Sequence, residues 1–198
     1  MVSGMISAAK KSAQRDALFI RQCMEWQKFY LTLFGIRIDA KIIKLPARKS
    51  DFDRLIIVAK GIAPNRVYAT CEKHFSCMRS YNNLDRDVPI NDRMPKQTYA
   101  VASRNEIESD RQYKNMCADD LIKKNIRGAT LLEHMLFCLK HFWETGNHLD
   151  RRDITMCSGS RYKDGRVPTT ISDRGVFKIH WCSRHDRYPR LRVREVIL

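Results

Sequence analysis

The stretch ATLLEHMLFCLKHFWET, residues 129–145, decides the fold of this chain. Its large apolar residues recur every three or four positions, and Gly128 and Gly146 flank it, which predicts one amphipathic helix. The residues expected to face the core along this helix are Leu132, Met135, Leu139, Phe142 and Trp143. The hydrophobic core is therefore expected to be built on this helix.

The segments around this helix predict a mixed fold. A strand at Thr98–Ser103 and a helix at Ala118–Lys124 come before it. Three short strands are expected after it, at Ile154–Cys157, Phe177–Trp181 and Leu191–Ile197. The order strand, helix, helix, strand, strand, strand keeps helices and strands apart. It favours an α+β fold in which the last three strands pair antiparallel.

The N-terminal part of the chain predicts one long helix and several shorter elements. The expected elements are a helix at Ala8–Phe34, short apolar pieces at Ile36–Ile43 and Leu55–Ala59, a helix at Asn65–Phe75 and a long polar loop at 80–96. The run LIIVA within the second apolar piece is β-branched and continuous, as in a buried strand. We expect residues 1–95 to form a helix with a small α/β segment, packed on a domain of residues 96–198.

The chain is strongly basic. Its 198 residues carry a net charge of +15, and residues 151–198 alone hold twelve Arg and Lys against five Asp and Glu. A surplus of this size attracts polyanions over long range. It therefore favours an anionic partner, with nucleic acid as one possibility.

Cysteine content and hydropathy indicate the compartment. Seven cysteines without regular spacing fit a reducing compartment better than a disulfide framework. The first residues, MVSGMISAAKKSAQRD, contain no apolar core of a signal peptide, and no apolar run is long enough to span a bilayer. We expect a cytoplasmic protein without a membrane partner.

Two groups of Cys and His contain residue types that can bind zinc. Cys71, His74 and Cys77 fall nearly on one face of a predicted helix. His134, Cys138 and His141 share a stripe that borders the core face of the central helix. Zinc requires a fourth ligand in either place, and buried cysteines and boundary histidines explain both groups. We expect no metal.

No constellation of catalytic residues stands out. Any of seven cysteines could pair with any of six histidines, but nothing in the local sequence marks one thiol as activated. The segment SGSRYKDG lacks the Lys-Ser/Thr that ends a phosphate-binding loop. We therefore expect a protein that is not an enzyme and has no cofactor.

The C-terminal segment is the strongest candidate for function. Arginines alternate there with aromatic residues, a mixture that suits contact with a protein or with nucleic acid. Strand alternation predicts that Phe177, Ile179 and Trp181 point into the core, whereas Lys178 and His180 point outward.

Several motifs carry a resemblance to a known family. They are YAVASR from Tyr99, the central helix continued through GNHLD, CSGSR from Cys157, and FDRLIIVAKGIAPNRVYATC from Phe52. Over most of its length the chain resembles an uncharacterised family of small proteins from candidate-phyla bacteria. The tail is similar to the variable region of proteins diversified by retroelements, which display hypervariable positions on a C-type lectin-like fold.

The resemblance implies a scaffold that presents a variable recognition surface to a protein or other macromolecule. Adenine-directed mutagenesis in such systems yields few Lys, Glu, Gln, Met or Trp residues, and none of these occurs between Cys182 and Arg194. Framework roles would fall to Ser158, Gly159, Trp181 and Arg192. The predicted contact residues are Tyr162, Thr170, Asp173, Arg174, Lys178, His180, Ser183, Arg184, His185, Arg187, Tyr188 and Arg190. The alternative is a basic nucleic-acid-binding protein that uses the same tail.

Overall fold

A computed structural model describes residues 2–47 and 49–198, with side chains from Asp16 onward. The helices are α1 (Val2–Phe34), α2 (Pro64–His74), α3 (Leu84–Asp87), α4 (Ala118–Lys123) and α5 (Leu131–Thr145), with short 3-10 turns at Ala40–Ile42 and Arg111–Tyr113. The strands are β1 (Arg54–Val58), β2 (Cys77–Arg79), β3 (Ile90–Asn91), β4 (Tyr99–Ser103), β5 (Ile154–Met156), β6 (Ser160–Arg161), β7 (Val167–Asp173), β8 (Val176–Cys182) and β9 (Leu191–Val193). The fold is α+β, as the sequence predicted.

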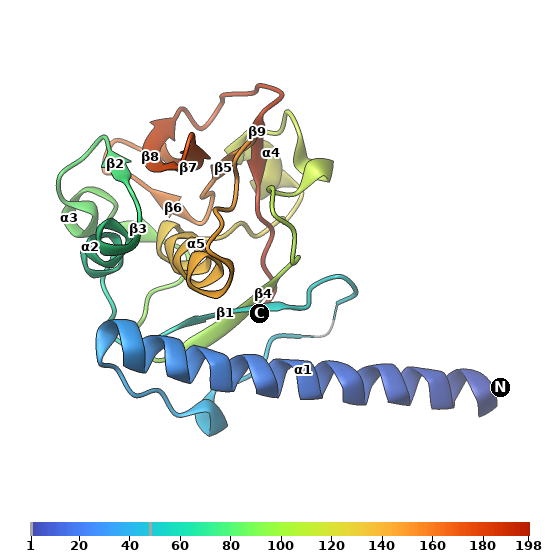
Figure 1. Cartoon of the computed structure of the whole chain (residues 1–198). Coiled ribbons are helices and arrows are strands. Elements are labelled where there is room, and N and C mark those ends of the chain that lie inside the picture. The colour runs from blue at the N-terminus through green and yellow to red at the C-terminus, as the bar shows by residue number, and fades with distance from the viewer. Residues whose placement is uncertain (1, 48) are drawn as a thin grey trace.

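The elements lie in layers around α5 (Figure 1). The β1–β4 pair lies between α1 and α5, and the sheet that contains β7 and β8 lies on the other side of α5. That sheet has five strands in the order β2-β8-β7-β5-β9. Strand β7 pairs antiparallel with both β5 and β8, whereas β2 pairs parallel with β8 and β9 parallel with β5.

The predicted set of three antiparallel strands was wrong in two respects. Strand β7 was missed, and β9 runs parallel to its neighbour β5. The sequence of β7, VPTTISD, contains a proline and four polar residues, so it lacks an apolar alternation. Nevertheless six of its seven residues are buried, because both faces of this strand are covered.

Helix α5 agrees closely with the prediction. Thr130 caps its N-terminus, where the Thr130 hydroxyl accepts from the Glu133 amide and the Glu133 carboxylate accepts from the Thr130 amide. Gly146 ends the helix with φ of 70°, a left-handed conformation that costs glycine little. Leu132, Met135 and Leu139 are buried as predicted, but Phe142 and Trp143 are only half-buried. Residues 131–140 are all buried, so the first ten residues of the helix do not have the single core face that the sequence predicted.

The N-terminal segment packs beneath the β1–β4 pair. The Trp26 indole donates to the Leu55 carbonyl at 3.1 Å, and the Tyr30 hydroxyl donates to the Ile57 carbonyl at 2.7 Å. The long helix and the β1 strand were predicted. The apolar piece Ile36–Ile43 forms no strand, since only a 3-10 turn is found there.

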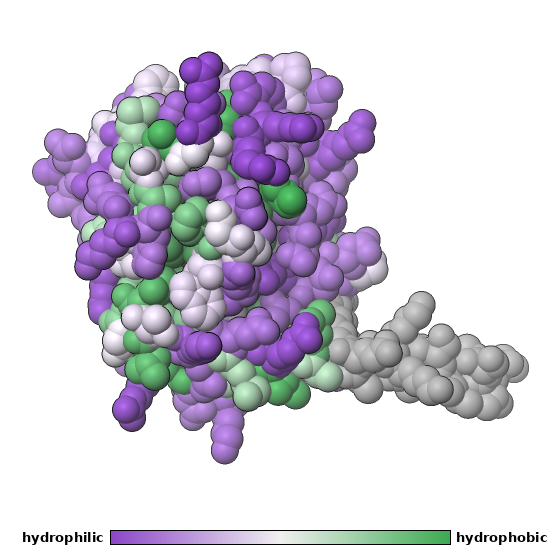
Figure 2. All heavy atoms as spheres, viewed as in Figure 1, coloured by the Kyte–Doolittle hydropathy of each residue, from purple (hydrophilic) through white to green (hydrophobic). Residues whose placement is uncertain are grey.

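Two further features concern the chain as a whole. One core cluster of buried residues extends from Phe19 to Val196 and so draws on both predicted segments; the boundary at residue 95 stays a prediction. Among the described residues, no helix combines the length and the apolar character needed to cross a membrane. Hydrophilic residues cover much of the face shown in Figure 2.

Candidate recognition surface

The centre of the molecule holds a buried polar network between α5 and the five-stranded sheet. His134 Nε2 lies 3.0 Å from Asp150 Oδ2, and the Arg194 guanidinium donates to Asp150 Oδ1 at 2.9 Å. Cys138 Sγ lies 3.4 Å from the same His134 nitrogen. Burial alone would raise the pKa of Asp150, but the Arg194 charge and the His134 contact outweigh it and hold that pKa below its ordinary value.

This network does not have the geometry of a catalytic triad. Cys138 and Asp150 both approach one nitrogen of His134, so the ring cannot relay a proton from thiol to carboxylate. Burial and the nearby Asp150 charge raise the pKa of the Cys138 thiol well above its usual value, which disfavours the nucleophilic thiolate. The network connects α5, through His134 and Asp150, to Arg194 at the end of β9, and we interpret it as structural.

The two groups of Cys and His that were weighed as zinc ligands are not arranged as helical spacing suggested. In the described part of the chain, His134 and Cys138 meet Asp150 instead of His141, which lies two turns, or about 10 Å, along the helix from His134. Arg194 already neutralises Asp150 there.

The first group is separated by the end of a helix. Helix α2 ends at His74, so Cys77 belongs to strand β2 and does not continue the helical face of Cys71 and His74. The helical spacing that suggested a metal site therefore does not exist.

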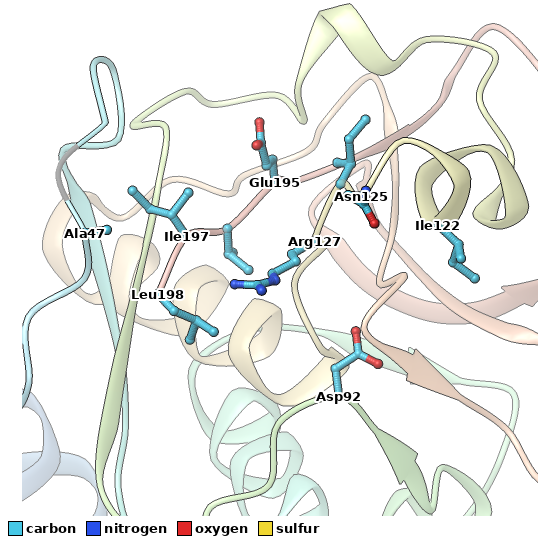
Figure 3. Close-up of a pocket in the computed structure, with 10 residues that line it drawn as sticks. Ala47, Asp92, Ile122, Asn125, Arg127, Glu195, Ile197 and Leu198 are labelled. Carbon is cyan, nitrogen blue, oxygen red and sulfur yellow. The ribbon is translucent and has the colours of Figure 1, made fainter.

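A cavity of about 540 Å³ opens beside the C-terminal segment (Figure 3). The Arg127 guanidinium points into it, Asp92 lies on another side, and Ile197 and Leu198 supply apolar walls. The Glu195 carboxylate at its rim is held by Lys49, Arg104 and Tyr113. The described residues that line the cavity include no Cys, Ser, Thr, Lys or His, so it contains no nucleophile paired with a base.

Most of the predicted contact residues lie at the surface. Arg174, Arg184, His185, Arg187 and Arg190 are exposed. Asp173, Lys178, His180, Ser183 and Tyr188 are half-buried, with Lys178 paired to Asp173 at 2.7 Å. The predicted outward direction of Lys178 and His180 is consistent with this placement. The stretch 183–190, called the recognition loop below, brings together six of the twelve residues.

Two predicted contact residues are wrong, because they are buried. Thr170 lies in the middle of β7, opposite Thr155 on one side and Ile179 on the other. Tyr162 packs its ring 4.5 Å from that of Tyr81 and donates its hydroxyl to the His180 carbonyl. Missing β7 explains the first error, since Thr170 was placed in a loop.

The prediction for Trp181 is also wrong, because this residue was expected in the core and lies at the surface. Phe177 and Ile179 are buried as predicted, but Trp181 is 45% exposed. Its indole meets the Arg166 guanidinium, whose carbon lies 3.9 Å from the ring centre. Alternation places Trp181 on the same side of β8 as Phe177, but at this end of the strand an arginine covers it instead of the core.

Trp181 belongs to a small group of side chains at the edge of the sheet. Arg166 also hydrogen-bonds to the Tyr81 hydroxyl and pairs with Asp164. We call Tyr81, Tyr162, Arg166 and Trp181 the tryptophan cluster. Of these four side chains Trp181 is exposed, Tyr81 and Arg166 are half-buried, and Tyr162 is buried beneath Tyr81 and supports it. Trp, Tyr and Arg are the residue types that contribute most to protein interfaces. Tyr81 and Arg166 were not predicted, since only the fold brings them to Trp181.

The charges of the recognition loop are largely paired. Arg184 donates to Asp119 at 2.6 Å, and Arg187 donates to Asp120 at 2.9 Å, both on α4. The Arg184 hydrogen bond lowers the pKa of the Asp119 carboxyl. Within the loop, the Ser183 amide donates to Asp186 at 2.8 Å. These pairs reduce the local positive field although the whole chain is strongly basic.

Comparisons of this chain with protein-family models, with curated proteins and with solved structures find no match.

Proposed function

We propose that this chain is a non-enzymatic binding protein that presents the recognition loop and the tryptophan cluster to a macromolecular partner, most suitably a protein. The observation that carries the proposal is that a buried strand, β9, directly follows a loop whose side chains are mostly exposed. In the frame, Leu191 and Val193 are fully buried. Next to it, Arg184, His185 and Arg187 are exposed in one short loop.

The backbone of the loop is held independently of most of its side chains. The Asp186 amide donates to the Ser183 carbonyl. At the end of the loop, the Ile154 amide donates to the Arg190 carbonyl at 2.7 Å. The Leu191 amide donates to Tyr188. Exposed side chains on such a backbone can change with little effect on stability. This property is what a variable surface of the retroelement-diversified type requires.

The order of elements also supports the C-type lectin-like part of the proposal. Strand β4 is followed by helices α4 and α5 and then by strands, in the order expected for that fold. Of the four expected framework residues, Ser158 and Gly159 are buried, Arg192 is half-buried and Trp181 is exposed. A Cβ atom added at Gly159 would lie 2.8 Å from the Gly128 carbonyl oxygen, so the CSGSR motif needs a glycine there.

A protein partner fits the surface better than nucleic acid does. Arginines that already pair with Asp119 and Asp120 must give up these contacts to bind phosphates. The partly exposed Trp181 beside Arg166 offers a large apolar face that a protein side chain can cover. Seven free cysteines, six of them buried, fit a reducing compartment, and we include a cytoplasmic location in the proposal.

The direct test is sequence diversity at the gene tail. Deep sequencing in the source population should show substitutions concentrated at the codons of Arg184, His185, Arg187 and Arg190. The codons of Gly159 and of the buried strands serve as the internal control and should not vary. A nearby reverse transcriptase gene with a second copy of the tail that differs at adenines is also expected. Even variation across loop and frame, or none in the loop, would contradict the proposal.

A second test distinguishes the proposed protein-binding function from the alternative, binding of nucleic acid. Binding of a 20-nucleotide single strand and of a 20-base-pair duplex is measured by anisotropy from low to physiological salt. We expect weak binding that disappears near physiological salt, as for nonspecific attraction to a basic protein. The variant with Arg184, Arg187 and Arg190 changed to Glu is compared with one in which Lys41, Lys44 and Lys60 are changed to Glu. Micromolar binding at physiological salt, lost only in the first variant, would replace this proposal.

A further inference from the structure

The two outer edges of the β1–β4 pair are covered differently. On the β1 edge, side chains of α1 pair with the main chain. Gln22 accepts from the Leu55 amide at 2.9 Å, and the Trp26 and Tyr30 hydrogen bonds described above reach carbonyl groups of the same strand. Helix α1 therefore closes the outer edge of β1.

The register of the pair fixes the direction of the main-chain groups of β4. Leu55 lies opposite Ala102, and Ile57 lies opposite Ala100. In an antiparallel pair, two residues at a non-hydrogen-bonded position both turn their N–H and C=O groups away from the partner strand. Because the groups of Leu55 and Ile57 bond to α1, those of Ala102 and Ala100 point to the outer edge of β4.

Ile197 covers only one of these two positions. The Ala102 amide donates to the Ile197 carbonyl at 3.0 Å, and the Ile197 amide donates to the Ala102 carbonyl at 2.9 Å. The chain end marked C accordingly lies beside β4 in Figure 1. Among the described residues, none forms a strand pair with Ala100 on this side. Ala100 is only 5% exposed, and a buried main-chain group without a partner is costly, so this position favours a ligand that brings its own N–H and C=O groups.

A groove of about 830 Å³ lies along this open part of the edge, and we call it the β4 groove. Thr98, Tyr99 and Ala100 line it from β4 and the residue before it. The segment 42–47 lines it as well, and the Ala47 amide donates to the Leu198 carbonyl at 2.6 Å. Because main-chain groups alternate in direction along a strand, this carbonyl points away from β4, and the segment 42–47 lies one strand position further out. The β4 groove therefore leaves room for an extended segment between the two.

The side chains around the β4 groove are apolar or positively charged. Ile42, Leu45 and Leu198 supply apolar walls, and Lys44 and Lys60 are exposed. Among the described residues, the lining contains no Asp or Glu that would neutralise these lysines in the groove. A peptide that carries both acidic and apolar side chains matches this lining.

We infer that the β4 groove binds an extended acidic segment of a partner protein, which adds a strand to the outer edge of β4 at Ala100. Main-chain hydrogen bonds to the edge supply affinity, and the lysines and apolar walls select the sequence. Nucleic acid would meet the two lysines, but it has no N–H and C=O pattern to match the edge. The lining shares no residue with the recognition loop or the tryptophan cluster, so the inference does not depend on the proposed function.

A fluorescent eight-residue peptide that alternates valine and glutamate tests the inference with the full chain, by anisotropy at physiological salt. We expect saturable binding. Two further peptides carry methyl groups on the main-chain nitrogens of either the valines or the glutamates, which removes the donors along one edge of the extended peptide. At least one of the two should bind tenfold more weakly than the parent peptide. No binding of the parent, or full affinity in both methylated peptides, would overturn the inference.

Charge variants locate the binding site. Lys44→Glu combined with Lys60→Glu should weaken binding of the parent peptide at least tenfold, because the β4 groove then repels the glutamates. Lys114→Glu combined with Lys124→Glu is the matched control, since both lysines are exposed and lie outside the groove. The control should change the affinity less than twofold. Equal weakening in the two variants would indicate general attraction to a basic protein and would overturn the inference.

Amide hydrogen exchange, followed by NMR, reports on the edge itself. The Ala100 amide should exchange quickly in the free chain and become at least tenfold slower when the parent peptide is bound. The Ala102 amide, which already bonds to Ile197, is the internal control and should exchange slowly in both states. A slow Ala100 amide in the free chain, or a bound peptide that leaves this amide unprotected, would contradict strand addition at β4.

Discussion

The buried pair of Arg194 and Asp150 gives a quantitative prediction about stability. Asp150→Asn keeps the size of the side chain but removes the charge that faces the guanidinium at 2.9 Å, and both residues are almost completely buried. Arginine cannot lose its proton, so the folded variant keeps an uncompensated buried charge. Removing one member of a buried pair costs about 3–5 kcal/mol. For a chain of this length the melting temperature should fall by roughly 6–20 °C.

Urea denaturation at pH 7, followed by far-UV circular dichroism and by tryptophan fluorescence, measures the change. Asp173→Asn is the matched control, because it removes the carboxylate of the solvent-accessible, half-buried Lys178 pair and should leave the midpoint almost unchanged. Adding Arg194→Met to Asp150→Asn should recover part of the lost stability, since the unpaired charge is then gone. An Asp150→Asn variant as stable as the parent, or a double variant with additive losses, would refute the reasoning.

Three further predictions concern the frame. Leu139→Ala should cost about 2–5 kcal/mol in urea denaturation because Leu139 is fully buried, whereas Ile122→Ala at an exposed site should change little. The folded-state pKa values of Asp150 and Glu195 are lowered, so the stabilisation that these carboxylates give is present above about pH 4 and is lost as the pH falls through the folded-state values. The free energy of unfolding, measured by urea denaturation at decreasing pH, should therefore fall below about pH 4. A rise in stability on acidification would contradict this prediction. Gly159→Ala should cost about 1–3 kcal/mol, since the added Cβ meets a backbone oxygen at 2.8 Å; unchanged stability in thermal melts would argue against that close contact.

The sequence alone was sufficient for the elements whose signals are local. Helix α5 was predictable because its apolar period and its flanking glycines lie within about twenty residues. Strand β1 was predictable from a continuous β-branched run, and the burial of Phe177 and Ile179 followed from alternation. The α+β class follows from these elements.

The tertiary structure decided what depends on contacts between distant segments. Strand β7 is polar in sequence and becomes a central strand only because β5 and β8 pair with it and layers cover both faces. Trp181 is exposed because the end of β8 meets Arg166 there, and alternation along one strand carries no information about that neighbour. His134 meets Asp150 instead of His141 because the chain turns back after α5, whereas helical spacing describes only one helix. Periodicity reports which side of an element is apolar, but burial at a given position depends on what the rest of the chain places over it.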